Sequence, residues 1–279
     1  MGLFDRGVEI KTPQQVVAMR RAGLVVGRTL ELLRASVRAG ISTGELDAIA
    51  EDHIRSSGAT PSFQGYHGFP ASICASVNDE VVHGIPGDRV LADGDVVSID
   101  CGAIVPDDSG QGWHGDAAIT VAVGAVADDV TELMRVTEEA MWRGIAAARP
   151  GGRVTDISHA VEHFVRSQGR YGILEDYTGH GIGTAMHQPP NVPNYGRPGK
   201  GPRLVAGLAL AVEPMVTLGT KEVSVLEDDW TVVTDDGSCA AHFEHTFTLT
   251  PTGTWVLTAL DGGEARLAAL GVPFGGVTD

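Results

Sequence analysis

Five side chains in this sequence could together hold metal ions: Asp100, Asp116, His180, Glu213 and Glu244. Each stands at the edge of a strand-like segment or in a glycine-rich turn. Four carboxylates with a single imidazole suit divalent ions such as Co, Mn, Fe(II), Zn or Ni better than a thiolate zinc site would. One ion does not need four carboxylates, whereas two ions that share bridging carboxylates would use them all. The residues therefore predict a site for two divalent ions, whose charge the four acids roughly balance.

The segment VVSID, residues 96–100, places the first of these ligands. Its continuous β-branched run is typical of a buried strand. A buried carboxylate such as Asp100 must be paired or bound to a cation to offset its desolvation. We predict that this strand ends at Asp100, that an Asp/Gly-rich hairpin loop follows, and that a return strand begins at Asp116.

The chain also repeats itself. Residues 90–100 (VLADGDVVSID) match residues 203–213 (RLVAGLALAVE), which places Asp100 on Glu213. Residues 51–58 match 162–169 at nearly the same offset. Two matches in the same order indicate a duplicated αβ unit. We expect one catalytic domain over 1–279, with pseudo-repeat halves of about 10–125 and 126–260, whose carboxylate-bearing strands converge on one site.

The helices that must support these strands have clear start signals. Capping boxes at Thr12–Gln15 and Ser42–Glu45 predict helices that run to Gly40 and Gly58. Amphipathic stretches predict two further helices over 127–150 and about 155–168.

Two later regions carry other signals. Residues 178–202 are dense in Gly and Pro and predict a loop whose shape is fixed by turn residues. After Glu213, short alternating segments separated by Asp/Gly turns predict an antiparallel meander.

Composition limits the function classes. The chain has 279 residues, with 20 basic and 36 acidic ones, and a formal net charge of −16. This balance argues against direct binding to nucleic acid or to an anionic membrane. Three cysteines without CxxC spacing argue against disulfides and structural zinc and indicate a reducing compartment. The first ten residues lack an apolar signal region, so we expect a soluble cytoplasmic protein.

Several motifs, taken in order, resemble one known family. They are YHGFP (66–70), NDEVVHGIPG (78–87), SIDCG (98–102), WHGDAA (113–118), GHGIGTAMH (179–187), VEPMV (212–216), DDWTVVT (228–234) and EHT (244–246). From about Ile10 to Thr252 the chain resembles the methionine aminopeptidases of bacterial type I. The resemblance implies the α+β pita-bread fold, in which duplicated αβ halves surround a curved, mostly antiparallel sheet with helices outside.

The resemblance also implies a role for each candidate ligand. Asp116 and Glu244 would bridge two metals, Asp100 would complete one, and His180 with Glu213 the other. A hydroxide between the metals would attack the scissile carbonyl, and Glu213 would relay a proton to the leaving amine. His187 is similar to the imidazole that stabilises the oxyanion, and His83 to the one that contacts the scissile amide.

The substrate pocket implied by the resemblance is an apolar slot for one thioether side chain. Its matching positions are Tyr66, His67, Phe69, Cys74, His83, Met186, His187 and Trp230. Two departures fall here, because Met186 stands where many relatives carry Phe and Phe63 where some carry Cys.

Other histidines have simpler interpretations. His159 and His163, in HAVEH, match an inverzincin pattern, but their helix already belongs to the repeat. Strand alternation should turn His114 and His245 away from the neighbouring ligands, as structural residues. His242 should share the face of Glu244, and either borders the site or is only a neighbour.

The resemblance therefore implies an aminopeptidase that removes the initiator methionine from nascent proteins with a small second residue. Its partners would be nascent N-termini near the ribosome, and it would act as a monomer. One alternative is an Xaa-Pro aminopeptidase or prolidase, which is similar in fold and metal ligands. Another, from a different class, is a metal-free pita-bread binding protein.

Overall fold

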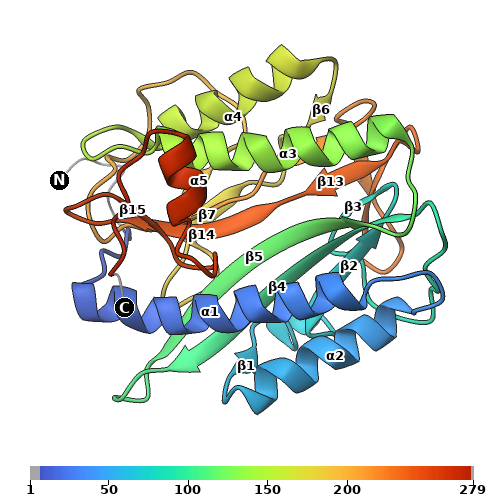
Figure 1. Cartoon of the computed structure of the whole chain (residues 1–279), viewed down its shortest axis with the longest axis horizontal. Coiled ribbons are helices and arrows are strands. Elements are labelled where there is room, and N and C mark those ends of the chain that lie inside the picture. The colour runs from blue at the N-terminus through green and yellow to red at the C-terminus, as the bar shows by residue number, and fades with distance from the viewer. Residues whose placement is uncertain (1–6, 278–279) are drawn as a thin grey trace.

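A computed structural model describes residues 7–277 of the chain. A curved sheet runs through the middle, and helices cover its outer face in two pairs (Figure 1). The helices are α1 (Pro13–Ser36), α2 (Thr43–Ser56), α3 (Asp128–Ala147), α4 (Val154–Gln168) and α5 (Glu264–Ala269). In Figure 1, α1 and α2 lie below the long strands, and α3 and α4 lie above them.

The two capping boxes start their helices as predicted. The Thr12 hydroxyl accepts from the Gln15 N–H at 3.3 Å, and the Gln15 side chain accepts from the Thr12 N–H at 2.8 Å. Ser42 and Glu45 exchange the same pair of bonds. Both helices end earlier than predicted, at Ser36 and Ser56. The first stops there because Val37 is already extended, with φ −61° and ψ 122°.

The main sheet has nine strands, all paired antiparallel, in the order β1-β4-β5-β14-β9-β7-β8, with β2 on β4 and β15 on β14. Their bounds are β1 Thr60–Pro61, β2 Ile73–Val77, β4 Val96–Pro106, β5 Gly112–Ala122, β7 Gly179–Gly181, β8 Gln188–Val192, β9 Ala209–Val212, β14 Glu244–Leu249 and β15 Thr254–Val256.

The remaining strands form two three-stranded sheets. One contains β13 (Ala240–His242), β10 (Met215–Thr217) and β6 (Gly172–Ile173). The other contains β11 (Val223–Val225), β12 (Val232–Thr234) and β3 (Glu80–Val82). A short 3-10 turn, Tyr66–Gly68, precedes β2.

The prediction that a strand ends at Asp100 and its return begins at Asp116 is wrong. β4 and β5 pair without interruption from Val96↔Ala122 to Pro106↔Gly112, so both acids lie within long strands. Gly102 and Gly115, which lie between the acids, permit close packing rather than turns. A Cβ on Gly115, for example, would lie 2.8 Å from the backbone nitrogen of Gly23 in α1. The turn itself is confined to the tip, where the Asp107 N–H donates to the Gln111 carbonyl at 2.8 Å.

The region after residue 178 also contains more strand than expected. Residues 178–202 form β7 and β8 within the predicted loop. The glycines of β7 allow close strand contact, since a Cβ on Gly179 would lie 2.3 Å from the Ala211 carbonyl oxygen. The expected meander is divided, because β13 and β14 belong to different sheets. Only the β11–β12 and β14–β15 pairings keep the simple hairpin order.

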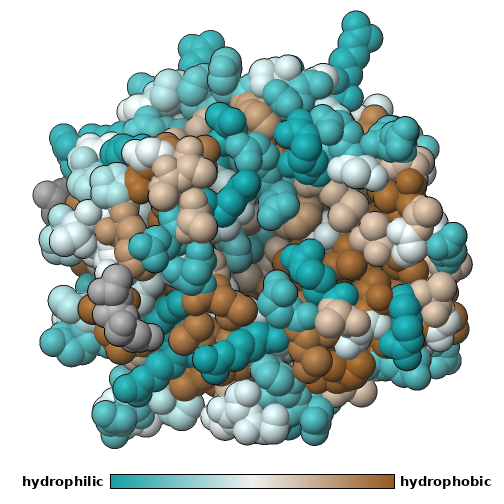
Figure 2. Space-filling view, viewed as in Figure 1, coloured by the Kyte–Doolittle hydropathy of each residue, from teal (hydrophilic) through white to brown (hydrophobic). Residues whose placement is uncertain are grey.

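The core lies between the sheet and the helices. Its largest fully buried side chains include Trp113, Phe247 and Leu133. On the face shown in Figure 2, hydrophobic residues are interspersed with hydrophilic ones. Among residues 7–277, no helix combines the length and apolar character that crossing a bilayer requires. The three cysteines, all in the described part of the chain, are unpaired.

Candidate active site and metal centre

Five consecutive strands of the main sheet supply the five predicted ligands. Asp100 lies on β4, Asp116 on β5 and His180 on β7, while Glu213 directly follows β9 and Glu244 begins β14. The register explains how three of the acids meet. Ala118 pairs with Asp100 on one side and with Glu244 on the other, and Asp116 lies two residues before it on the same face.

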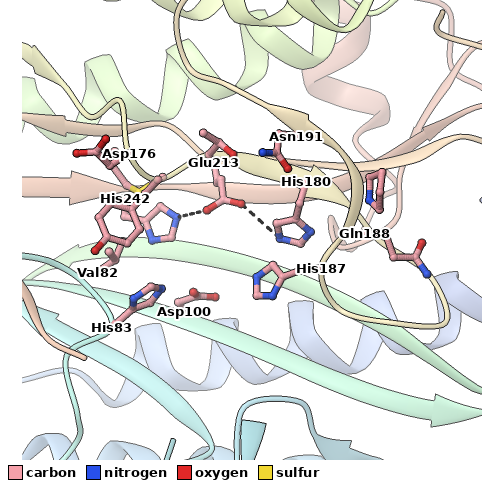
Figure 3. Close-up of a pocket in the computed structure, with 14 residues that line it drawn as sticks. Val82, His83, Asp100, Asp176, His180, His187, Gln188, Asn191, Glu213 and His242 are labelled. Atoms are coloured by element: carbon pink, nitrogen blue, oxygen red, sulfur yellow. Dashed lines mark ion pairs between the residues drawn. The ribbon is translucent and has the colours of Figure 1, made fainter. Parts of the chain in front are cut away.

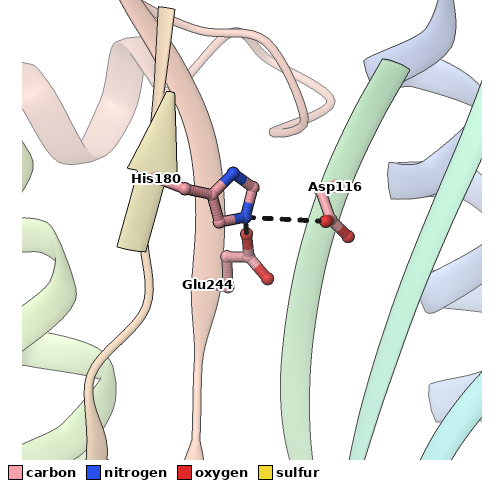
Figure 4. A group of neighbouring side chains, drawn as sticks. All are labelled: Asp116, His180 and Glu244. Atoms are coloured by element: carbon pink, nitrogen blue, oxygen red, sulfur yellow. Dashed lines mark ion pairs between the residues drawn. The ribbon is translucent and has the colours of Figure 1, made fainter. Parts of the chain in front are cut away.

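The imidazole of His180 directs one ring nitrogen at the surrounding acids. Its Nδ1 donates to the Gly181 carbonyl at 3.0 Å, so in the neutral ring Nε2 carries only a lone pair. This Nε2 lies 3.4 Å from Glu213 Oε1 (Figure 3). It lies 3.9 Å from Asp116 Oδ2 and 4.0 Å from Glu244 Oε1 (Figure 4). A lone pair and several carboxylate oxygens repel one another, so a cation bound among them would stabilise the arrangement.

Burial makes the cluster costly without such a cation. It raises the pKa of Asp100 to about 7. Burial, followed by the charge of Glu244, raises the pKa of Asp116, and burial with neighbouring acids raises the pKa of Glu213 and of Glu244. Burial likewise lowers the pKa of His180 to about 3. The acids repel one another when ionised, and a positive charge at their centre would remove the penalty.

Unpartnered polar atoms support the same conclusion. Asp100 Oδ1, Asp116 Oδ1, Glu244 Oε1 and His242 Nε2 are buried and have no hydrogen-bond partner among residues 7–277. Native structures rarely leave such atoms unsatisfied. Carboxylate oxygens and imidazole nitrogens are ligands for borderline divalent ions, so the donor set fits metal binding.

Two groups of side chains could each hold an ion. Ligand atoms of Asp116, His180 and Glu244 lie within 4.8 Å of one another, as do those of Glu213, His242 and Glu244. Figure 3 shows Glu213 between His180 and His242, whose Nε2 is 3.8 Å from Glu213 Oε2. Of the two interpretations of His242, the structure therefore favours a place at the site. Asp100 lies outside both groups but lines the same cavities.

Two cavities meet at this cluster. The first, of about 270 Å³, is lined by all the predicted substrate-binding positions, together with Phe63, Asp100, Asp116, His180, Glu213 and Glu244. The second, of about 460 Å³, shares His83, Asp100, His180, His187 and Glu213 with the first. It adds polar residues that the sequence did not single out, including Asp176, Gln188 and Asn191 (Figure 3). Gln188 and Asn191 lie within the segment that we predicted to be loop, and Asp176 just precedes it.

Two more imidazoles face the cavities. His187 Nδ1 lies 2.8 Å from the Tyr66 hydroxyl, and its ring packs edge-on against His180 at 4.4 Å between centroids. Burial lowers the pKa of His187 and lowers that of His83 to about 4. His83 and His67 both adopt left-handed backbone conformations, with φ of 61° and 48°. Strain of this kind is common at functional sites.

The other histidines fall outside the ligand groups. His159 and His163 are exposed on α4, with their rings 5.7 Å apart. His245 bonds the Thr258 hydroxyl at 2.8 Å and packs against Trp142. The expectation for His114 is wrong about its face, because residues two apart on β5 point the same way as Asp116. The His114 ring Nδ1 lies 3.1 Å from the Ser62 hydroxyl, and the backbone N–H of His114 donates to the Gly183 carbonyl at 2.9 Å.

Comparison with known proteins bears directly on this site. Residues 17–251 match the model of metallopeptidase family M24. This chain belongs to metallopeptidase family M24. Membership in family M24 explains the cluster of acids, since the family's enzymes are metallopeptidases. Metal use is therefore a property of the fold and site together.

Several relatives that match most of this chain are named methionine aminopeptidase. The chain is 53% identical over 259 residues to methionine aminopeptidase 1 of Mycobacterium tuberculosis, covering 91% of this chain and 96% of the relative. It is 50% identical over 250 residues to methionine aminopeptidase of Clostridium acetobutylicum, covering 89% and 98%. The solved methionine aminopeptidase of Thermotoga maritima matches with a TM-score of 0.86 at 41% identity, covering 90% and 99%. The predicted resemblance and the pita-bread fold are confirmed.

The prolidase alternative has only distant support within family M24. The solved prolidase of Pyrococcus furiosus is 22% identical, with a TM-score of 0.72, and this chain covers 66% of it. At that identity the likeness shows the fold alone.

Proposed function

We propose that this chain is a metal-dependent aminopeptidase that removes the initiator methionine from nascent proteins with a small second residue. The observation that carries the proposal is the junction of an apolar cavity of about 270 Å³ with the Asp116–His180–Glu244 group. The relatives named methionine aminopeptidase support the same assignment.

We assign two divalent ions to the site, held by Asp100, Asp116, His180, Glu213 and Glu244. Four buried or half-buried carboxylates around one imidazole support this number, because they exceed what one ion needs. Following the resemblance, Asp116 and Glu244 would be shared between the ions, Asp100 would help to hold one, and His180 with Glu213 would help to hold the other. When bound, the ions would lower the pKa of a water molecule toward about 7 and would polarise the substrate carbonyl. Co, Mn, Fe(II), Zn and Ni all suit these ligands.

The chain's own side chains then orient and stabilise the reacting groups. His187 faces the cluster and is held by the Tyr66 hydroxyl at 2.8 Å, which suits it to donate a hydrogen bond to the oxyanion. His83 borders both cavities, where the scissile amide would lie. Glu213, whose pKa is raised by burial, would carry a proton to the leaving amine through its carboxylate.

The methionine side chain would occupy the first cavity. Phe69, Cys74 and Met186 are buried there in one apolar cluster with Phe63, and Trp230 packs edge-on against Phe69 at 5.1 Å. Sulfur and aromatic groups of this kind contact a thioether favourably. The second, polar cavity would receive the chain beyond the cleaved bond.

The substrate also defines the setting that we propose. Nascent N-termini arise at the ribosome, so the enzyme would act there in the cytoplasm, as a monomer. Three free cysteines accord with a reducing compartment.

Matched peptides test the proposal. The metal-loaded chain should release methionine from Met-Ala-Ser with a kcat/KM at least about tenfold above that for release of leucine from Leu-Ala-Ser, because the slot discriminates by shape and length. Met-Leu-Ser should be a poor substrate because of its larger second residue. Faster cleavage of Ala-Pro-Ser than of Met-Ala-Ser would instead establish the prolidase alternative, and no cleavage of any peptide would refute both.

A further inference from the structure

Three residues ahead of the family match lie beside the start of β9 and against the turn that follows β7. The matched region begins at residue 17, whereas Glu9, Ile10 and Lys11 precede α1. The Lys11 N–H donates to the Gly207 carbonyl at 2.8 Å, and Ile10 forms a β-bridge with Leu208. The segment is therefore fixed to the sheet beside β9.

Lys11 brings a buried positive charge to this place. Its side chain is 1% exposed, and its Nζ lies 3.5 Å from Glu9 Oε2 and donates to the Glu9 carbonyl at 3.1 Å. Burial lowers the pKa of Lys11, and the Glu9 carboxylate opposes that shift. A buried ammonium needs such a counter-charge, so Lys11 holds the Glu9 carboxylate in place.

The same carboxylate binds the turn that follows β7. Glu9 Oε2 accepts from the Thr184 N–H, and Oε1 accepts from the Thr184 hydroxyl, both at 3.1 Å. The Thr184 hydroxyl in turn accepts from Gln188 Nε2 at 3.1 Å. A Cβ on Gly183 would lie 2.2 Å from Glu9 Oε2 and 2.7 Å from Lys11 Nζ. The backbone of the turn thus rests directly on the ion pair, so that a side chain at residue 183 would displace Glu9 or Lys11.

This turn presents His187 to the cavity. His187 lies three residues after Thr184, and its ring packs against Tyr66 and His180, which line the cavity. On the opposite side of the turn, the backbone N–H of His114 donates to the Gly183 carbonyl at 2.9 Å. The position of the imidazole therefore depends on how firmly the turn is fixed at Gly183 and Thr184.

We propose that Glu9 and Lys11 are positioning residues for the reaction, which act through Thr184 to set His187 against the substrate carbonyl. The inference rests on the proposed function, because it uses the role given there to His187. A misplacement of about 1 Å can reduce a rate by about 100-fold even when it originates away from the reacting atoms.

A double-mutant cycle tests this coupling in the full-length, metal-loaded chain. Glu9→Gln and Thr184→Ala should each lower kcat on Met-Ala-Ser by about tenfold to a hundredfold, with KM nearly unchanged, because a transition-state contact is weakened. The double variant should be no slower than the worse single variant. Lys11→Met, which keeps the volume of the side chain, should act in the same direction.

A matched control separates positioning from general stability. Asp156 is another carboxylate that joins distant backbone, since it accepts from the Gly199 N–H at 2.7 Å and the Arg153 N–H at 2.7 Å. It lines neither cavity. Asp156→Asn should lower the melting temperature while leaving kcat within about twofold. A change in kcat with Glu9→Gln no larger than with Asp156→Asn would overturn the proposal.

A second measurement does not depend on turnover. Ring 15N–1H spectra of the metal-free and zinc-loaded chain, with His187 assigned by His187→Gln, should show the His187 signals shifted or broadened in Glu9→Gln and unchanged in Asp156→Asn. Unaltered His187 signals in Glu9→Gln would refute positioning, whatever the substrate. If the parent fails to cleave Met-Ala-Ser, the proposed function fails, and these spectra still decide whether Glu9 sets the imidazole.

Discussion

His187 is the imidazole whose role can be separated from metal binding. It faces the cluster, yet belongs to neither ligand group, and its Nδ1 is engaged by Tyr66. His180, by contrast, directs Nε2 at three carboxylates. Two histidines whose ring centroids are 4.4 Å apart are therefore assigned different tasks by their hydrogen-bond partners.

His187→Ala should lower kcat by about 100-fold to 1000-fold, because it removes an oxyanion donor. Bound metal per chain should not change, since Asp116, His180 and Glu244 remain. Steady-state kinetics and metal analysis of the same preparation check this. Equal loss of activity and metal would reassign His187 as a ligand.

Asp100 should make the metal-free chain less stable as the pH rises. Burial raises its pKa from 3.8 to about 7, so the folded chain retains a proton that the unfolded chain releases near pH 4. Stability from this group is complete below about pH 4 and is lost between there and about pH 7.

Asp100→Asn removes this effect. Without metal, the variant should match the parent near pH 4 and become more stable than it toward pH 7, by on the order of 1 kcal/mol per pH unit. With metal the order should reverse, because the variant lacks a ligand. Urea unfolding at several pH values, with and without metal, measures both differences. A stability difference that is independent of pH would show that Asp100 is not the titrating group.

At the scale of elements, two threonines hold the strands that carry the shared ligands. β5 and β14 pair only at Ala118↔Glu244 and Ala117↔His245. Beyond one end, the Thr246 hydroxyl donates to the Asp116 carbonyl at 2.7 Å and accepts from its N–H at 3.3 Å. Beyond the other, Thr120 makes the same two bonds with His242. Side chains thus continue the ladder where the backbones separate.

Thr246→Val should loosen Asp116 from β14. We expect a loss of about 1 to 3 kcal/mol of stability and about 10-fold to 100-fold weaker metal binding, whereas Thr246→Ser should retain both. Thr248→Val is the matched control, because its buried hydroxyl donates to the Leu208 carbonyl on the opposite side of β14 at 2.9 Å. Calorimetric metal titration should show weaker metal binding by Thr246→Val than by Thr248→Val. Equal weakening by both would attribute the effect to general destabilisation.

The elements also show what the sequence could reveal. Helix starts were predictable because Thr12 and Ser42 act through bonds three residues away. Strand limits were not, because Gly102 and Gly115 suggested turns while serving contacts with residues far along the chain. The ligands could be recognised from their types and motifs, whereas Asp176, Gln188 and Asn191 carry no such signal and line the second cavity because of the folded shape of the chain. The Glu9–Thr184 contact likewise spans parts of the chain that no local pattern connects.

At the scale of the molecule, the order of elements accords with the proposed duplication. α1 and α2 precede β4 with Asp100, and α3 and α4 precede β9 with Glu213. We propose that halves of about 10–125 and 126–260 descend from one unit. Each half then contributes acids that repel those of the other, so their closure around one centre depends on shared cations.

Metal removal should therefore loosen the whole molecule. A single ion present at about 100 times its dissociation constant stabilises the folded chain by about 2.7 kcal/mol. For a domain of this size that corresponds to a melting temperature higher by roughly 5 to 10 °C. Chelation should reverse the gain, as followed by calorimetry. Glu244→Gln, which alters a ligand common to both groups, should melt at nearly the same temperature with or without chelator. A parent chain whose melting ignores chelation would show that the two halves close without cations between them.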